Sequence, residues 1–218
     1  MRIKNSKAII SFVFCLFASS AAVSEIKLYK GVSLGDEWNK IVETVGYYDC
    51  SESGLKIACL DNQKFLGAIG DLGVFFDTEA AVKVMFVSED LSLYQKAMKF
   101  FPSKGFALVA IETNNGANDF IAMNKQNGPE KAVAKLIEIE QFGLSNGFVS
   151  YTFLEGDQKS ILNYGNIAQA YASLNSGDRA LTLSVSEEVQ AVNVMITFEP
   201  SLVDLNELQE RNKLTEDF

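Results

Sequence analysis

The clearest pattern in the chain is a pair of alternating stretches near its C-terminal end. Between residues 181 and 186, leucine and valine alternate with threonine and serine. After Glu187 and Glu188 the alternation resumes from Val192 to Phe198. A period of two residues is typical of a strand with one buried face and one face in water. The two stretches therefore predict a half-buried antiparallel hairpin.

A period of three to four residues predicts a short helix that ends at Gly46. Apolar residues recur at positions i, i+3, i+4 and i+7 from Trp38 to Val45, which places them on one helix face. Ser33 and Asp36 have the spacing of a capping box, and glycine commonly follows the last helical residue.

The same periodicities predict the other elements. Strands are expected at residues 55–60, 72–77, 81–87, 106–112, 119–124 and 148–154. Helices are expected at residues 91–101, 129–142 and 158–174 and from residue 202. The fold class is α+β, an antiparallel sheet with helices packed on one face. The order of elements suggests two tandem modules, a helix plus antiparallel meander at 25–90 and a second α+β module at 91–218.

The N-terminus predicts a signal peptide over residues 1–24. Three basic residues precede the apolar run Ala8–Ala18, and small residues follow, so cleavage is expected between Ala22 and Ser24. Cys15 raises lipidation as an alternative, but the bulky residue before it disfavours lipoprotein processing. The run is shorter than the roughly 20 residues that span a bilayer as a helix. We therefore expect a periplasmic or secreted protein with no transmembrane segment after cleavage.

The charge balance restricts the class of partner. The chain has 19 basic and 28 acidic residues, and cleavage would leave 16 basic residues and a net charge of −12. Nucleic-acid binding requires clustered cations, so this balance argues against it. Acidity serves solubility in many proteins, but it also attracts a basic protein partner over long range.

Two cysteines, Cys50 and Cys59, would remain after cleavage. Because export exposes thiols to oxidation, a disulfide is the simplest interpretation. A metal or redox site is the alternative. The chain contains no histidine, and the spacing is not Cys-x-x-Cys, so two cysteines alone make a poor zinc site. The expectation is a structural disulfide, with no metal and no cofactor.

Catalytic motifs are scarce. Without histidine, Ser-His-Asp and Cys-His arrangements are excluded, and the glycines at 67–73 are not followed by the lysine of a phosphate-binding loop. The acidic neighbours Asp36 and Glu37, and Glu187 and Glu188, suit capping or solvation. Glu138 and Glu140, two residues apart on a helix, would point to different faces. No catalytic residue is predicted, although a glycan hydrolase with two distant carboxylates stays open as an alternative.

The first module resembles one repeat of the β-lactamase inhibitory protein fold, which is itself similar to small lipoproteins of outer-membrane assembly. The resemblance rests on Gly31-Val32-Ser33, the helix end Val45-Gly46, the pair Cys50 and Cys59, and the strand Leu72–Phe76. It covers residues 28–88, with Val32-Ser33 in place of the usual Met-Thr. The resemblance implies a non-catalytic binding module that presents a sheet face and loops to another protein.

Aromatic residues near the cysteine pair are the candidate partner-binding residues. Tyr47, Tyr48 and Asp49 adjoin Cys50, and Phe75 and Phe76 must lie on opposite faces of one strand. Aromatic side chains are favoured at interface centres, whereas burial in the core is their ordinary role. We expect an exported, inhibitor-like or immunity-like protein that binds another, basic protein. An envelope structural or assembly role is the alternative.

Overall fold

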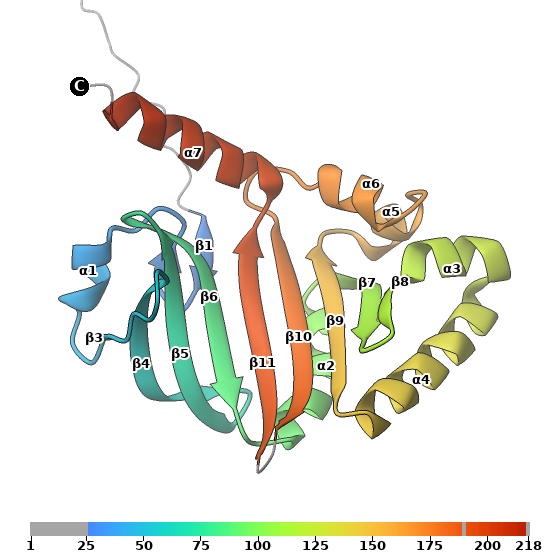
Figure 1. Cartoon of the computed structure of the whole chain (residues 1–218). Coiled ribbons are helices and arrows are strands. Elements are labelled where there is room, and N and C mark those ends of the chain that lie inside the picture. Colours follow the sequence, from blue (N-terminus) through green and yellow to red (C-terminus); the bar gives the residue numbers. More distant parts are fainter. Residues whose placement is uncertain (1–25, 189–190, 217–218) are drawn as a thin grey trace, which may run out of the picture.

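The computed structural model describes residues 26–188 and 191–216, and it confirms the α+β class (Figure 1). Within these residues, nine strands form one antiparallel sheet in the order β3-β4-β5-β6-β11-β10-β9-β7-β8. The predicted signal peptide and Cys15 lie outside the described residues.

The first half of the chain supplies one side of the sheet. Its elements are β1 (Lys27–Tyr29), β2 (Val32–Ser33), α1 (Trp38–Val42), β3 (Tyr48–Asp49), β4 (Lys56–Phe65), β5 (Ala68–Asp77) and β6 (Ala80–Ser88). The second half begins with α2 (Ser92–Ser103), β7 (Phe106–Thr113), β8 (Gly116–Asp119), α3 (Phe120–Asn127), α4 (Pro129–Ser145) and β9 (Phe148–Glu155). It ends with α5 (Gln158–Leu162), α6 (Ile167–Ala172), β10 (Arg179–Glu188), β11 (Ala191–Pro200) and α7 (Leu202–Glu216).

A helix followed by a three-strand antiparallel meander occurs twice, with insertions. α1 precedes β4-β5-β6, with β3 between α1 and β4, and α4 precedes β9-β10-β11, with α5 and α6 between β9 and β10. The last strands of the two meanders, β6 and β11, pair antiparallel in the middle of the sheet, with Phe86 opposite Ile196. The boundary expected at residue 90 falls between β6 and α2, and one continuous sheet spans both sides of it.

The strongest β patterns agree with the structure. The alternating stretches form β10 and β11, which pair from Arg179–Pro200 to Glu188–Ala191. The glycine-containing stretch at 67–73 begins with a two-residue hairpin loop, in which Leu66 and Gly67 both have positive φ. A Cβ atom at Gly70 would lie 2.1 Å from the carbonyl oxygen of Val87. Glycine is therefore required there by the close approach of β6.

Two element predictions are wrong because short polar side chains cap helices. Residues 119–124 were expected as a strand, but the Asp119 carboxylate accepts a hydrogen bond from the Ala122 N–H at 2.9 Å and starts α3. The helix expected at 158–174 is divided into α5 and α6, because Asn166 caps a new helix by accepting from the Gln169 N–H at 2.9 Å.

The first helix is shorter than predicted. The Asp36 carboxylate does accept a hydrogen bond from the Ser33 N–H at 2.7 Å, as in a capping box. However, Ser33 belongs to β2 and the helix begins only at Trp38. Gly46 has a φ of +96°, which suits the turn that leads from the helix into β3.

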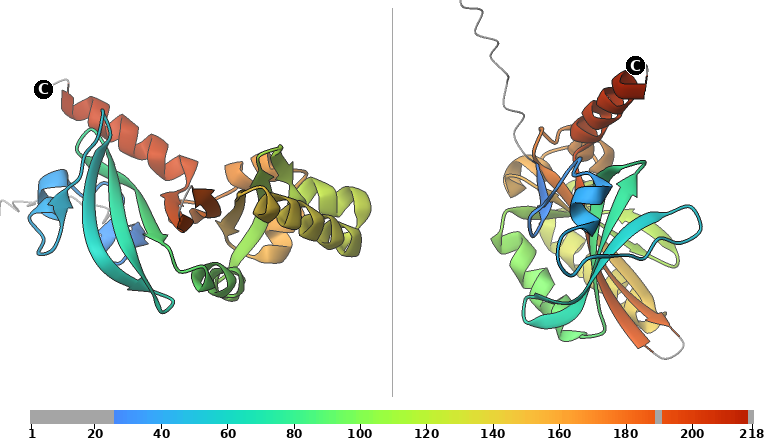
Figure 2. Two further views of the ribbon diagram at one scale, coloured as in Figure 1. Left: turned by 60° about the horizontal axis from the view of Figure 1, so that its bottom comes forward. Right: turned by 90° about the vertical axis from the view of Figure 1, so that its left-hand side faces the viewer.

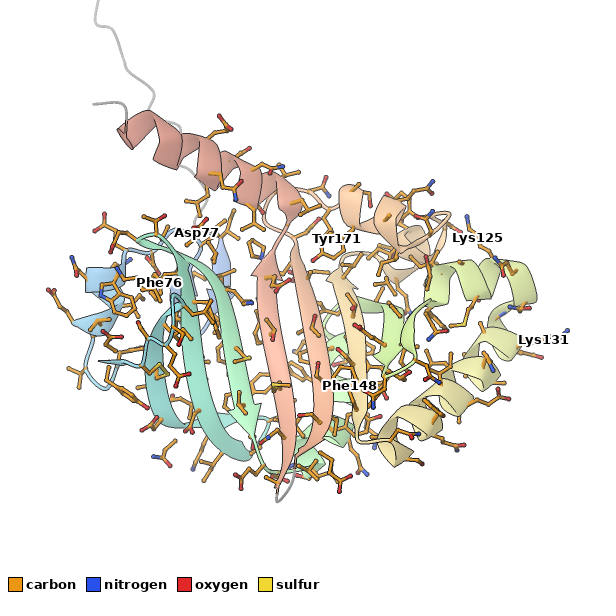
Figure 3. The ribbon with its side chains drawn as sticks, in the orientation of Figure 1. Phe76, Asp77, Lys125, Lys131, Phe148 and Tyr171 are labelled. Carbon is orange, nitrogen blue, oxygen red and sulfur yellow. A yellow bond between two sulfur atoms is a disulfide. The ribbon has the colours of Figure 1, made fainter. Side chains whose placement is uncertain are left out.

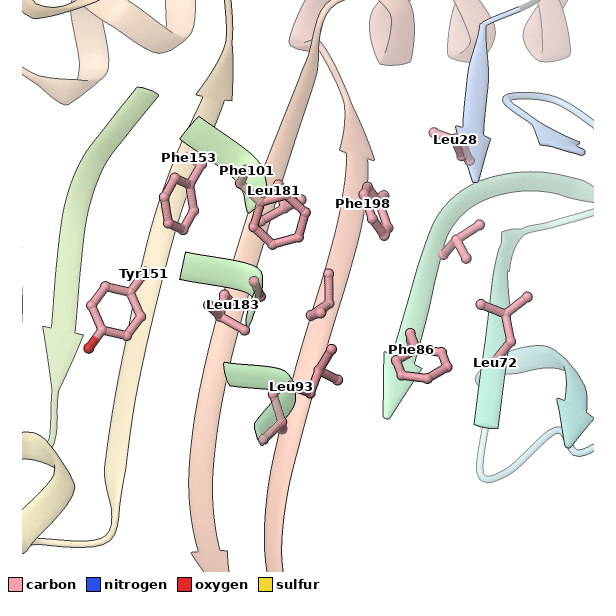
Figure 4. Packing of buried hydrophobic residues seen from close by; sticks show 14 of the residues in the cluster. Leu28, Leu72, Phe86, Leu93, Phe101, Tyr151, Phe153, Leu181, Leu183 and Phe198 are labelled. Carbon is pink, nitrogen blue, oxygen red and sulfur yellow. The ribbon is translucent and has the colours of Figure 1, made fainter. Parts of the chain in front are cut away.

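The main core lies between one face of the sheet and α2. Leu181, Leu183 and Phe86 face Leu93 and Phe101 of α2, as Figure 4 shows, and Ile196 belongs to the same cluster. A second cluster packs α3, α5 and α6 against the opposite face of β7, β9 and β10. It comprises Ala107, Val109, Ile121, Leu154, Ile161, Ala170, Leu174 and Ala180. α7 crosses the end of the sheet at which β11 stops (Figures 1 and 2).

The predicted disulfide is present. Cys50 and Cys59 are bonded with a Cα–Cα distance of 5.8 Å. Cys59 lies opposite Tyr48 in the β3–β4 ladder, and the Cys50 N–H donates to the Ile57 carbonyl at 3.0 Å. The disulfide therefore closes the outermost hairpin of the sheet, directly after α1.

Replacement of both Cys50 and Cys59 by serine should lower the free energy of unfolding by about 2.5–3 kcal/mol, because the disulfide closes a ring of about ten residues in the unfolded chain. Urea unfolding of the oxidised protein, the reduced protein and the double variant measures the effect. The reduced protein should resemble the double variant. An unchanged unfolding midpoint in both would contradict a stabilising disulfide.

Candidate functional site

One face of the sheet carries half-exposed side chains from β4 across β5, β6, β11 and β10 to β9. These residues alternate with the core residues of the same strands, so they point away from α2. One row across the strands comprises Cys59, Gly73, Met85, Thr197, Thr182 and Thr152. The next row begins with the half-exposed Val87 and Met195 and ends at Ser184 and Ser150, which are buried and share a hydrogen bond between their hydroxyls. We call this surface the open face (Figure 3).

Apolar side chains gather at the β4–β5 end of the open face. Ile57 and Phe75 are half-exposed, and a Cβ atom at Gly73 would lie 3.6 Å and 3.4 Å from them. Tyr48 is 45 % exposed and lies directly opposite Cys59. Tyr48, Ile57 and Phe75 therefore form a group of partly exposed side chains around Cys59 and Gly73.

Two carboxylates border this apolar surface. The Tyr48 hydroxyl donates to Asp61 at 2.8 Å, and this hydrogen bond raises the pKa of Tyr48. Asp71 accepts from the Asn62 N–H at 3.0 Å. Both aspartates are exposed, and no lysine or arginine in the described part of the chain forms an ion pair with either of them. Their negative charges therefore remain available to a cation from outside.

The end of the open face at which β6 begins and β11 stops, next to Phe75, is more balanced in charge. The Lys83 ammonium lies 4.9 Å from the Phe75 ring centroid and 4.0 Å from Glu199. Tyr171 of α6 lies at this end (Figure 3). Burial, with a contribution from Glu199, raises the pKa of Tyr171 to about 12.

The predicted partner-binding residues divide between two environments. Tyr48 and Phe75 lie on the open face, and Phe76 lies buried on the opposite face at 9 % exposure. Tyr47 packs against the core, where burial raises its pKa. Asp49 is exposed but faces away from Tyr48, and its carboxylate accepts from the Ser51 N–H at 2.9 Å. The structure thus places Tyr48 and Phe75 on the same face of the sheet, without Tyr47 and Asp49.

Glu140 joins a polar cluster on the core side of the sheet. Its carboxylate accepts hydrogen bonds from Tyr94 of α2 and, at 2.8 Å, from Tyr151 of β9. The two tyrosine hydroxyls are 2.7 Å apart. Burial is the main cause that raises the pKa of each tyrosine well above its ordinary value, so both remain protonated donors. The cluster connects α2, α4 and β9, which is a structural role.

The other acidic candidates are placed as caps or on the surface. Glu138 is exposed and pairs with Lys135 at 2.8 Å, whereas Glu140 points inward, as the helical spacing predicts. Asp36 is buried in its turn, and Glu37 and Glu187 are exposed. The Glu188 side chain lies outside the described residues. Asp204, 1 % exposed, accepts from Ser176, Gly177 and Ser201 and anchors α7.

Neither a metal-binding group nor a membrane-spanning helix occurs in the described ranges. Residues 26–188 and 191–216 hold no group of three His, Cys, Asp or Glu side chains placed to bind a metal ion. In the same ranges, no helix has the length and apolar character to cross a membrane.

Asp61 and Asp71 were not predicted from the sequence as site residues. β4 extends five residues beyond the predicted strand, to Phe65, and its irregular pairing with β5 near Asn62 brings the two aspartates together. The polar composition of Asp61–Lys64 masked the strand. The alternation of Asp71, Gly73 and Phe75 was the available signal that these residues share a face.

Comparisons of the chain with protein-family models, curated proteins and solved structures found no match. The function of the chain is therefore inferred from the geometry of the open face.

Proposed function

We propose that the chain is an exported, non-catalytic binding protein that docks a basic partner protein on the open face. The observation that carries this proposal is the apolar surface of Tyr48, Ile57 and Phe75, bordered by Asp61 and Asp71. Aromatic side chains held rigidly at the centre of a patch are the usual anchors of protein interfaces. An inhibitor-like or immunity-like role in the periplasm or outside the cell fits such a surface.

The charges favour a basic partner. A lysine or arginine that approached Tyr48 would meet two exposed carboxylates with which no lysine or arginine of the described residues forms an ion pair. The whole chain carries a net charge of −9, which attracts a cationic protein before contact and raises the association rate. An acidic partner would be repelled by both effects.

The disulfide supports the export half of the proposal. Persistent disulfides form in oxidising compartments, whereas cytosolic thiols are kept reduced. The predicted signal peptide is consistent with the same compartment.

Neutralising the two carboxylates should weaken binding without disturbing the fold. A protein captured from envelope extracts would be identified and purified. Its affinity for the wild type and for the Asp61→Asn, Asp71→Asn double variant would then be measured by calorimetry at low and high salt. Because charges at the rim of an interface contribute modestly, we expect the double variant to bind the partner roughly threefold to tenfold more weakly than the wild type. Its affinity should also depend less on the salt concentration.

The matched control is the Glu130→Gln, Glu138→Gln double variant. It changes the net charge equally at exposed positions on α4, away from the open face, and should lose little affinity. A captured partner that bound the Tyr48→Ala variant and the aspartate double variant as tightly as the wild type would contradict docking on the open face.

A further inference from the structure

A cavity of about 320 Å³ lies on the opposite side of the sheet from the open face. β1, α2 and the ends of β4, β7, β10 and β11 surround it. Its walls are mostly aromatic and include Tyr29, Phe65, Phe100 and Phe106. The volume is in the range of small-molecule sites, which are commonly apolar with a few polar groups. Aromatic rings from five separate elements thus line one space.

Tyr29 supplies an unsatisfied polar group in one wall of this cavity. Its ring stacks on Phe198 with centroids 4.9 Å apart and meets the Phe65 ring edge-on at 5.5 Å. Its hydroxyl is buried and has no hydrogen-bond partner within the described part of the chain. Buried polar groups in native proteins are normally paired, and an unpaired one is destabilising. Because an unpaired buried group calls for an explanation, the Tyr29 hydroxyl directs attention to this cavity as a candidate binding site.

The two charged residues of the cavity are both cations. The Arg179 guanidinium is held by two hydrogen bonds to Glu155, at 2.7 Å and 2.8 Å, and lies 5.5 Å from the Phe106 ring centroid. Its charge is therefore largely balanced. The exposed Lys104 ammonium lies 5.5 Å from the Phe100 ring centroid, and among the described residues no ion pair includes it.

The rim of the cavity is thus positive on a protein whose net charge is negative. No acidic residue is among the residues that line it. An apolar body among the rings would gain from burial and from edge-to-face ring contacts. An anionic head group beside Lys104 would gain a charge-assisted contact with the ammonium. A neutral head group would lack this contact, and the Lys104 ammonium would repel a cationic one.

We propose that this cavity binds a small amphiphilic monoanion, with an aromatic or short acyl body between the rings and a carboxylate beside Lys104. The site is independent of the open face, because the residues that form the two surfaces alternate along β10 and β11 and point to opposite sides of the sheet.

Calorimetry on the folded chain with decanoate, phenylbutyrate, decanol and decylamine tests the proposal. We expect saturable binding of a carboxylate at one site, with decanol weaker by about threefold to tenfold and decylamine weaker still. The comparison of decanoate with phenylbutyrate decides whether the body is acyl or aromatic. Absence of saturable binding by either carboxylate would overturn the proposal.

Two variants locate the site. Lys104→Met keeps the apolar stem and removes the charge, so carboxylate affinity should fall about threefold to tenfold while decanol affinity stays unchanged. Lys99→Met, an exposed lysine of α2 outside the cavity, should leave the affinity for all probes unchanged. An equal loss in both variants, or an equal loss for decanol and decanoate, would refute the role given to Lys104. Thermal unfolding of each variant verifies that it is folded.

Discussion

Replacement of Phe101 by alanine is expected to lower the free energy of unfolding by about 3–5 kcal/mol. Phe101 is 1 % exposed and is the residue through which α2 meets several parts of the sheet. Its ring lies within 5.7–6.3 Å, between centroids, of Phe65, Phe100, Phe106, Phe153 and Phe198. Truncation loses the free energy of burying the ring and leaves a void that the neighbouring strands cannot close. The lost burial and the void both destabilise the fold.

Urea unfolding of the variant and of Phe142→Ala measures this effect against a matched residue. Phe142 is 40 % exposed on α4, and its truncation should cost about 1 kcal/mol or less, the usual size for a surface substitution. Equal losses in the two variants would contradict the central position assigned to Phe101. A reduced m-value would point instead to a change in the unfolded or native ensemble.

Replacement of Glu140 by alanine is expected to lower the free energy of unfolding by about 2–4 kcal/mol, because two buried hydroxyls lose their acceptor. Tyr94 and Tyr151 would keep only the hydrogen bond between themselves, which satisfies one donor of the two. The lost contacts join α2, α4 and β9, so the effect should extend across the core side of the sheet.

Glu138→Ala is the control for this variant, since it removes the same side chain two residues away on the same helix. Glu138 is exposed and its ion pair with Lys135 is a surface pair, which contributes little to stability. Hydrogen exchange should show faster opening of α2 and α4 in the Glu140 variant only. Equal stability of the two variants would show that the tyrosine cluster does not hold the helices.

The sequence predicted the strands and helices best where one face is buried along their whole length. β10 and β11 show this, because the core on one side and solvent on the other impose a period of two. The predictions failed where local hydrogen bonds decide the outcome. Asp119 ends β8 and begins α3 by capping, and Asn166 interrupts an apolar helical pattern. A single short polar side chain changes the hydrophobic periodicity very little, so the pattern does not reveal where such a residue caps a helix.

The candidate sites were less accessible to prediction than the fold. Tyr48 and Phe75 were identified because aromatic residues stand out near a disulfide. Asp61 and Asp71 come together only through the irregular pairing of β4 with β5. The aromatic cavity joins Tyr29, Lys104 and Arg179 from distant parts of the sequence. No spacing in one sequence predicts such a contact.

The pairing of β6 with β11 has a consequence for how the chain folds. Each meander pairs strands that are neighbours in sequence, whereas Phe86 and Ile196 meet only after most of the chain has been made. Closing so long a loop is entropically costly and slows folding. During synthesis, one edge of β6 therefore lacks its final partner until β11 emerges, and an apolar strand with an open edge is prone to pair with another chain. The nascent protein is most exposed to aggregation in that interval.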